Sequence, residues 1–98
     1  MIRHSVIFRL KYAKDSKEEK AFLDATLQLL AVPGVLHFER LKQTSKKNQF
    51  EYGLSMEFES EHVYAAYTAH PLHQAFIENF WTNGVADFLE IDYVNLDR

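Results

Sequence analysis

Strand-type and helix-type hydrophobic periodicity alternate along this chain of 98 residues, and the order of these segments constrains the fold more than any other feature. Residues 2–11 and 50–59 alternate between apolar and polar side chains, which predicts β-strands with two different faces. Residues 35–43 alternate poorly, as an edge or bent strand would, and residues 86–94 complete the set of four strands. Helical spacing fills the two longer intervals between these strands.

The first interval has clear helix boundaries. Ser16 and Glu19 stand at the spacing of a capping box, which predicts a helix start. Pro33 and Gly34 predict its end, because proline restricts the residue before it and glycine tolerates a turn. The apolar residues in between predict one buried side, formed by Phe22, Leu23, Leu27, Leu29 and Leu30.

The second interval predicts two helical pieces. Ser60 caps the first piece, and the break at His70 lets Pro71 begin the next one. Residues 83–84, an Asn-Gly pair, stop it. The second piece carries one apolar face, formed by His73, Phe76, Ile77, Phe80 and Trp81.

A strand–helix–strand–strand–helix–strand order predicts an α+β fold. With right-handed crossovers it becomes a ferredoxin-like βαββαβ domain over residues 1–98, with a four-stranded antiparallel sheet and both helical segments on one face. The other face would expose Ile7 and either Leu89 or Phe88. Pairing with a second copy would cover it, so we expect a homodimer whose two sheets form an α/β barrel.

Composition excludes several function classes. A net charge of −3 disfavours nucleic acid as a partner, and the absence of cysteine removes disulfides and thiolate chemistry. The apolar runs are too short to span a membrane, so we expect a cytoplasmic protein. Nucleotide-binding glycine motifs and a serine-hydrolase elbow are missing. His70 and His73 are three residues apart but separated by Pro71, so no metal and no cofactor is predicted.

Several short motifs occur together, in an order typical of one family. With them the chain resembles the stress-responsive dimeric α/β-barrel (Dabb) family, over nearly its whole length. The resemblance implies a homodimeric ferredoxin-like barrel. The motifs lie in residues 2–10, 32–35, 58–60 and 91–93, and in the segment Tyr67-x-x-His70-Pro71-x-His73.

Within this family the chain is similar to olivetolic acid cyclase-type polyketide cyclases. That similarity implies a catalytic pair at Tyr67 and His73 and a pocket histidine at His4. A second pocket histidine of those enzymes falls here at Tyr52, so the chain departs from them at this position.

The same residues suit proton transfer next to a carbonyl group. A histidine with a pKa near neutrality can remove the proton, and a tyrosine hydroxyl can hydrogen-bond the oxygen on which charge develops. His4 shares its strand face with Val6 and Phe8, so we expect it under the helices. The ligand-binding wall of this small apolar or aromatic site would be His4, Phe22, Tyr52, Leu54, Met56, Phe76 and Trp81.

Structural interpretations stay open beside these roles. His4 and Tyr67 also fit a hydrogen-bonded core, and His70 fits a helix cap. Glu90 and Asp92 share a strand face with Phe88; one could face the interior, but a surface or dimer-edge position is favoured. His37 and His62 lie on polar segments and receive no chemical role.

Three functions compete on this sequence. The first is a cofactor-independent cyclase, isomerase or lyase that acts on a small carbonyl or polyketide-like molecule through His73 and Tyr67. The second is a non-catalytic stress-associated or ligand-binding barrel. The third is a monooxygenase, because other dimeric α/β barrels carry out oxygen chemistry. The fold alone does not choose among them.

Overall fold

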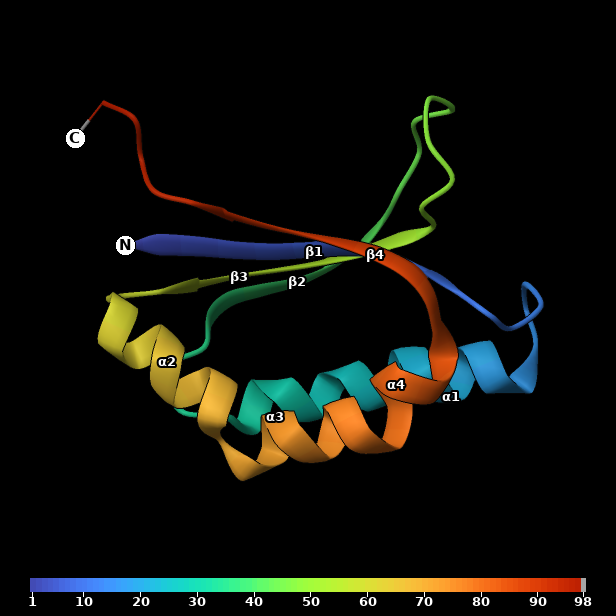
Figure 1. The fold of residues 1–98 in the computed structure, drawn as a ribbon, viewed down its shortest axis with the longest axis horizontal. Coiled ribbons are helices and arrows are strands. Elements are labelled where there is room, and N and C mark those ends of the chain that lie inside the picture. The colour runs from blue at the N-terminus through green and yellow to red at the C-terminus, as the bar shows by residue number, and fades with distance from the viewer. Residues whose placement is uncertain (98) are drawn as a thin grey trace.

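Four antiparallel strands form one sheet, and the helices pack against one of its faces (Figure 1). The structure is a computed structural model that describes residues 1–97. The strands are β1 (Ile2–Leu10), β2 (Leu36–Lys42), β3 (Tyr52–Phe58) and β4 (Val85–Tyr93), in the spatial order β2-β3-β1-β4. This order confirms the ferredoxin-like βαββαβ topology.

The first crossover runs through α1 (Lys17–Ala25) and the 3₁₀ segment η1 (Thr26–Ala31). At its start the backbone N–H of Glu19 donates to Ser16 Oγ at 3.1 Å, as a capping box requires. Leu27 and Leu30 are exposed, so their predicted place on the buried side is wrong. The cause is the change from an α to a 3₁₀ helix, which alters the spacing of residues that share a face.

The second crossover is built from α2 (Glu61–Ala69) and a longer run that begins at Pro71. That run consists of α3 (Pro71–Phe76), a π turn η2 (Ile77–Trp81) and α4 (Thr82–Gly84). His70 caps α3, because its Nδ1 accepts the backbone N–H of Leu72 at 3.1 Å. No helix within residues 1–97 is long and apolar enough to cross a membrane.

Strand β1 crosses the middle of the sheet and has the two faces that its sequence predicts. Its even-numbered residues are buried and its odd-numbered residues are more exposed. His4 is only 7% exposed and points with Val6 and Phe8 toward the helices. The core therefore lies between the helices and one face of the sheet, and His4 is the imidazole within it.

Strand β2 lies at a sheet edge, which explains its poor alternation. Its pairing with β3 shifts register between Leu36 and Glu39. His37, at this bulge, has a positive φ of 51° and contacts Glu57 on the surface. It stays outside the core, as its polar surroundings predict.

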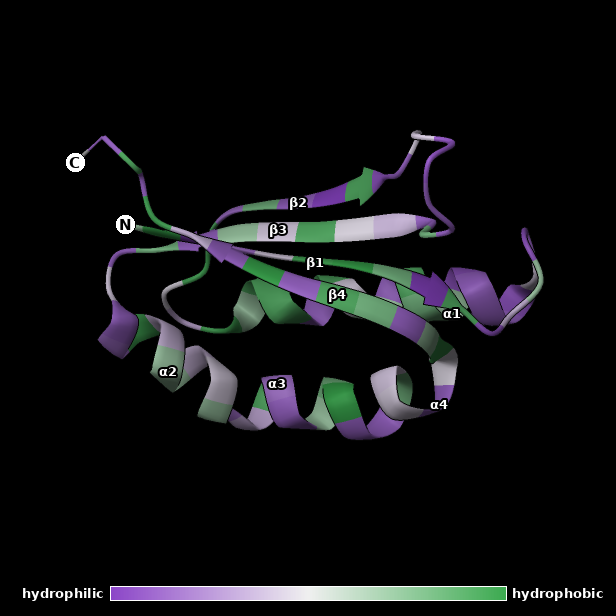
Figure 2. Ribbon diagram, turned by 45° about the horizontal axis from the view of Figure 1, so that its top comes forward, coloured by the Kyte–Doolittle hydropathy of each residue, from purple (hydrophilic) through white to green (hydrophobic). Residues whose placement is uncertain are grey.

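The opposite face of the sheet carries no helix (Figure 2). Ile7 lies there opposite Leu89 of β4. Leu41, Leu89 and Tyr93 are exposed large side chains. Of the two β4 residues considered for the open face, Leu89 lies there, while Phe88 packs edge-on against Trp81 on the helical side.

Candidate functional site

A cavity of about 240 Å³ lies between the sheet and the helices. Most of its wall is apolar, and the polar side chains that reach it are His4, Tyr67, His73 and Glu90. A larger surface hollow of about 740 Å³ surrounds Met1 and Tyr93 at one end of the sheet, but no histidine is among its described lining residues. Seven of the predicted site residues line the smaller cavity: His4, Leu54, Met56, Tyr67, His73, Phe76 and Trp81.

Two predicted wall residues lie elsewhere. Phe22 is almost fully buried behind the cavity, where its ring packs 5.6 Å from the rings of Phe8 and Phe76. Tyr52 lines a separate depression beside the β2–β3 loop. Burial and the neighbouring Glu19 carboxylate raise the pKa of Tyr52 to about 12, so its hydroxyl stays protonated.

The protonation of His73 follows from its contacts. Its Nδ1 lies 2.9 Å from the backbone carbonyl oxygen of Thr68, which can only accept a hydrogen bond. We therefore place the proton on Nδ1, which leaves an unprotonated Nε2. Burial lowers the pKa of His73 below its usual 6.5, although the bond to Thr68 opposes the shift. A neutral His73 with a free Nε2 lone pair is able to accept a proton.

Tyr67 lies between the two cavity histidines. The centroid of its ring is 4.7 Å from that of His73 and 6.2 Å from that of His4. The break at His70 thus brings Tyr67 of α2 next to His73 of α3, which helical periodicity could not establish. Burial, reinforced by the charge of Glu90, raises the pKa of Tyr67. Its hydroxyl therefore remains a hydrogen-bond donor at neutral pH.

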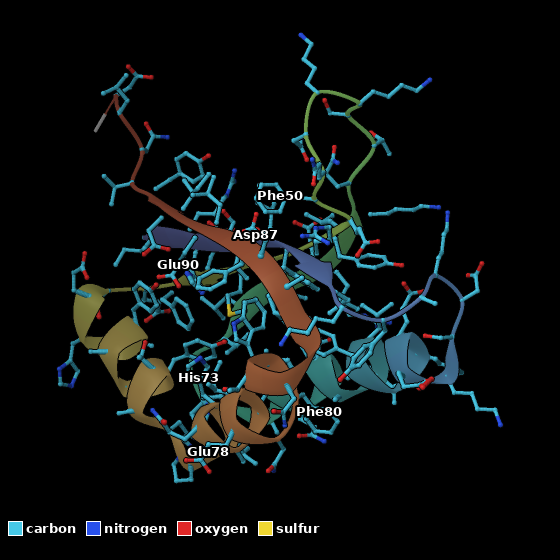
Figure 3. The ribbon with its side chains drawn as sticks, turned by 45° about the vertical axis from the view of Figure 1, so that its right-hand side comes forward. Phe50, His73, Glu78, Phe80, Asp87 and Glu90 are labelled. Atoms are coloured by element: carbon cyan, nitrogen blue, oxygen red, sulfur yellow. The ribbon has the colours of Figure 1, made fainter. Side chains whose placement is uncertain are left out.

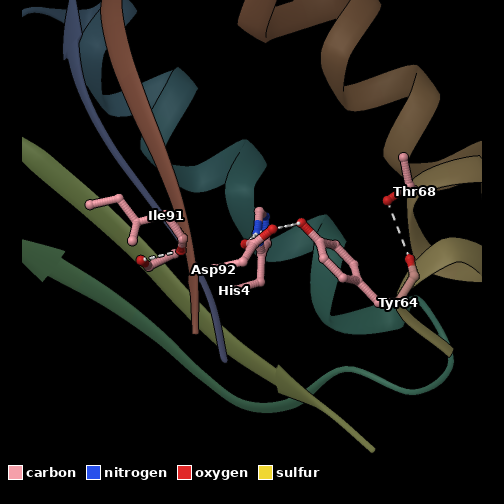
Figure 4. Close-up of polar contacts among 6 residues, drawn as sticks. His4, Tyr64, Thr68, Ile91 and Asp92 are labelled. Atoms are coloured by element: carbon pink, nitrogen blue, oxygen red, sulfur yellow. Dashed lines mark hydrogen bonds and ion pairs between the residues drawn. The ribbon is translucent and has the colours of Figure 1, made fainter. Parts of the chain in front are cut away.

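His4 belongs to a three-residue hydrogen-bond network (Figure 4). Its Nδ1 lies 2.6 Å from Asp92 Oδ1. The Tyr64 hydroxyl donates to Asp92 Oδ2 at 2.8 Å and also lies 2.8 Å from His4 Nδ1. Because a carboxylate only accepts hydrogen bonds, Nδ1 of His4 carries a proton. Burial and Asp92 raise the pKa of Tyr64, so its hydroxyl keeps the proton it donates.

Asp92 and Glu90 both lie on the helical side of the sheet and are nevertheless exposed, so this pair has the surface position favoured from sequence. In the antiparallel register Asp92 lies opposite His4 and Glu90 opposite Val6, whose side chains point to the helices. Figure 3 shows Glu90 on β4 and His73 on α3 at the two sides of the space between sheet and helices. The signal available in the sequence was their shared parity with Phe88.

The same corner offers atoms of the kind that bind metal ions. His4, Glu90 and Asp92 each present one such atom, and these atoms lie within 4.8 Å of one another. A carboxylate that accepts from Nδ1 of a histidine is a common support for a metal-bound imidazole. It is equally a common support for a histidine base, so the geometry alone assigns no metal. His70 and His73, by contrast, hydrogen-bond to backbone groups of their own segment.

A scan against family models matches residues 2–95 to the stress responsive A/B barrel domain, Dabb. No curated protein matches the chain significantly. Among solved structures, a Dabb family protein with a ferredoxin-like fold from Mesorhizobium loti MAFF303099 is 51% identical, with 97% of this chain and 96% of that chain covered and a TM-score of 0.94.

Two more distant structures share the fold. A hydroxynitrile lyase from Passiflora edulis is 16% identical, with coverage of 97% of this chain and 94% of that one and a TM-score of 0.83. A dimeric ferredoxin-like protein of unknown function from Thermobifida fusca YX is 19% identical, with coverage of 96% and 90% and a TM-score of 0.80. The family model spans nearly the whole chain, and the protein therefore belongs to the stress-responsive A/B barrel (Dabb) family.

Proposed function

We propose that the 240 Å³ cavity binds a small apolar or aromatic carbonyl compound, and that His73 and Tyr67 transfer a proton at the carbon next to its carbonyl group. The observation that carries this proposal is the contact between His73 Nδ1 and the Thr68 carbonyl, because it leaves Nε2 unprotonated on a ring whose centroid is 4.7 Å from that of Tyr67. A base and a hydroxyl donor then belong to residues that line the same, mostly apolar cavity.

The proposed step needs no group from outside the chain. Nε2 of His73 removes the proton of the C–H bond, and the electron pair moves onto the carbonyl oxygen to form an enolate. The Tyr67 hydroxyl donates a hydrogen bond to that oxygen as its charge grows. The imidazolium of His73 can swap its proton with solvent and then protonate the same carbon, which gives an exchange. Protonation of another carbon of the enolate completes an isomerisation.

The proposed reaction class is argued from the residues that line the cavity and not from the activities of similar proteins. The Passiflora protein is a hydroxynitrile lyase, but an identity of 16% supports only a shared fold. What supports proton transfer here is that burial lowers the pKa of His73 and raises that of Tyr67. Both shifts favour the protonation states that the step requires at neutral pH.

Solvent deuterium exchange tests the proposal directly. Small aryl ketones such as acetophenone are incubated with the protein in D₂O, at concentrations where NMR shows ligand-dependent shifts of the Trp81 indole signal. We expect the protein to accelerate deuteration of the carbon next to the carbonyl group. His73→Gln should lower that rate by roughly 100-fold, and Tyr67→Phe should lower it by roughly tenfold.

His62→Gln is the matched control, because His62 is exposed and lies outside the cavity. It should exchange protons at the wild-type rate. If the ketones bind in the cavity but His73→Gln exchanges as fast as the wild-type protein, proton transfer through His73 is rejected. The non-catalytic ligand-binding barrel then becomes the better account.

We also infer that two copies pair through the open face of the sheet. The support is the apolar set on that face, in which Leu41, Leu89 and Tyr93 are large and exposed. A monomer would leave this surface in water. The Thermobifida relative is described as dimeric, and its similarity to this chain is consistent with the same arrangement.

A further inference from the structure

The charge pattern of the cavity points to a preference in ligand charge. We propose that Glu90 makes the site selective for neutral or cationic ring compounds and makes it reject carboxylates of the same size. The inference rests on the proposed function and narrows its substrate class. Glu90 would be the specificity-determining residue.

The first argument is the placement of Glu90. Its partner across β1 is Val6, whose side chain points to the helices, and Glu90 is itself a lining residue of the cavity. No Lys or Arg is among the described residues that line this cavity. No hydrogen bond or ion pair occupies the Glu90 carboxylate within residues 1–97. Glu90 is an exposed residue, so its carboxylate stands at the solvent side of the cavity, and no Lys or Arg of the described wall compensates it.

The second argument is that the other polar groups do not supply positive charge. His73 is neutral at neutral pH because burial lowers its pKa. His4 is paired with the Asp92 carboxylate at 2.6 Å, so even a protonated His4 would leave that pair without net charge. If His4 is neutral, the Asp92 carboxylate behind it adds a further negative charge. In either case Glu90 gives the wall a net negative charge.

The third argument is that the charge of Glu90 affects the pKa values of other groups around the cavity. The Glu90 carboxylate contributes to the raised pKa values of Tyr64 and Tyr67, and it works against the lowering of the His73 pKa. Groups on both sides of the cavity therefore sense Glu90. A ligand held between them would sense it as well, and a carboxylate would be repelled.

Binding of three probes that share one ring tests the inference: benzylamine, benzyl alcohol and benzoate. The dissociation constants are measured by NMR titration at neutral pH and physiological salt, from the shift of the Trp81 indole signal. Benzylamine and benzoate are both ions of similar size. The cost of removing an ion from water therefore largely cancels in the ratio of their dissociation constants. We expect benzoate to bind at least about tenfold more weakly than benzylamine.

Two variants make the comparison specific. Glu90→Gln should reduce the benzylamine preference to about threefold or less. Glu78→Gln changes the net charge equally, but Glu78 is exposed on the helices and does not line the cavity (Figure 3). It should keep the wild-type preference. Benzyl alcohol should bind the wild-type protein and both variants alike.

The outcomes separate this inference from the proposed function. Equal binding of the two ions, or tighter binding of benzoate, would overturn the role of Glu90 and leave the cavity as a ligand site. Equal effects of Glu90→Gln and Glu78→Gln would do the same, because the preference would then come from the net charge of the protein. If none of the three probes shifts the Trp81 signal, the ligand site itself fails, and both proposals fail with it.

Discussion

The chemistry proposed here depends on the protonation of His73, on which burial and the hydrogen bond to Thr68 have the largest influence. Burial favours the neutral imidazole, whereas the Thr68 carbonyl stabilises the protonated form. Burial is the larger effect, so the pKa is lowered in the folded protein. Protonation of His73 therefore opposes folding, and this effect can be measured in how the free energy of unfolding depends on pH.

Stability should fall with acidification through His73. The unfolded chain binds the proton near the usual pKa of 6.5, whereas the folded protein binds it only at lower pH. Between these two values the unfolded state holds more protons, so the free energy of unfolding rises with pH up to about pH 6.5 and then levels off for this group. Urea unfolding of the wild-type protein and of His73→Gln between about pH 5 and pH 7 measures this pH dependence of the free energy of unfolding. An equally steep fall in the variant would contradict the assigned shift.

Asp92 should contribute to stability through its two bonds. Asp92→Ala removes the acceptor for His4 Nδ1 and for the Tyr64 hydroxyl, and within this network it leaves the two groups only each other as hydrogen-bond partners. We expect a loss of about 1–3 kcal/mol in urea unfolding. Asp87→Ala is the control, because Asp87 lies opposite Arg9 on the other face of β4. It should change the stability by less than about 0.5 kcal/mol. Equal losses of stability in Asp92→Ala and Asp87→Ala would mean that the hydrogen-bond network of Asp92 does not stabilise the fold.

Some of the site was predictable from single residues, and some was not. The position of His4 followed from its strand, because only one face of residues 2–11 is consistently apolar. The partners Asp92 and Tyr64 did not follow. Strand β4 has apolar residues on both faces, such as Phe88 and Leu89, so its sequence does not decide which face is inside. Only the register with β1 places Asp92 opposite His4.

At the scale of elements, the turn at Gly34 joins the first crossover to β2. Gly34 has a φ of +90°, and a Cβ added there would clash with Cγ1 of Val63. Both the backbone conformation and the contact disfavour any other residue. The Pro33-Gly34 pair was a clear sequence signal for this turn, whereas its contact with α2 was not visible in the sequence.

Gly34→Ala should therefore destabilise the fold by about 1–3 kcal/mol. The double variant with Val63→Ala separates the two causes, because it removes the steric clash and keeps the backbone strain. We expect the double variant to lose less than the sum of the two single variants in urea unfolding. Additive losses would show that the contact with Val63 is not the reason for glycine.

Helix type was the element-scale feature that sequence reasoning missed. The pattern of Leu27 and Leu30 suits a buried α-helical side, but the chain tightens into η1 after Ala25 and turns both side chains to solvent. Here Thr26 is fully buried, and its hydroxyl donates to the Leu23 carbonyl at 2.6 Å. Tertiary packing of a small polar residue thus overrode the apolar periodicity.

At the scale of the whole molecule, the order of elements was enough to predict the topology. Right-handed crossovers leave few arrangements for a βαββαβ chain, and the strand order β2-β3-β1-β4 is the expected one. The cavity could not be predicted in the same way. Its volume depends on how the rings of Trp81, Phe76 and Phe88 pack across two layers, which no local pattern encodes.

Dimerisation through the open face makes a prediction about one leucine. Leu89→Glu would place a charge in the proposed interface, so we expect sedimentation equilibrium at micromolar concentration to show monomers where the wild-type protein forms dimers. Leu27→Glu is the matched control, because Leu27 is similarly exposed but lies on the helical side, and it should stay dimeric. A wild-type protein that sediments as a monomer would refute the pairing, and so would a dimeric Leu89→Glu variant.

The most direct test of the whole account is the ¹⁵N spectrum of the His73 imidazole at neutral pH, assigned by its loss in His73→Gln. The account predicts a neutral ring with the proton on Nδ1, and a shift of the Nε2 signal when acetophenone fills the cavity. A proton on Nε2 would contradict the account, as would an Nε2 signal that does not move while Trp81 reports a bound ketone.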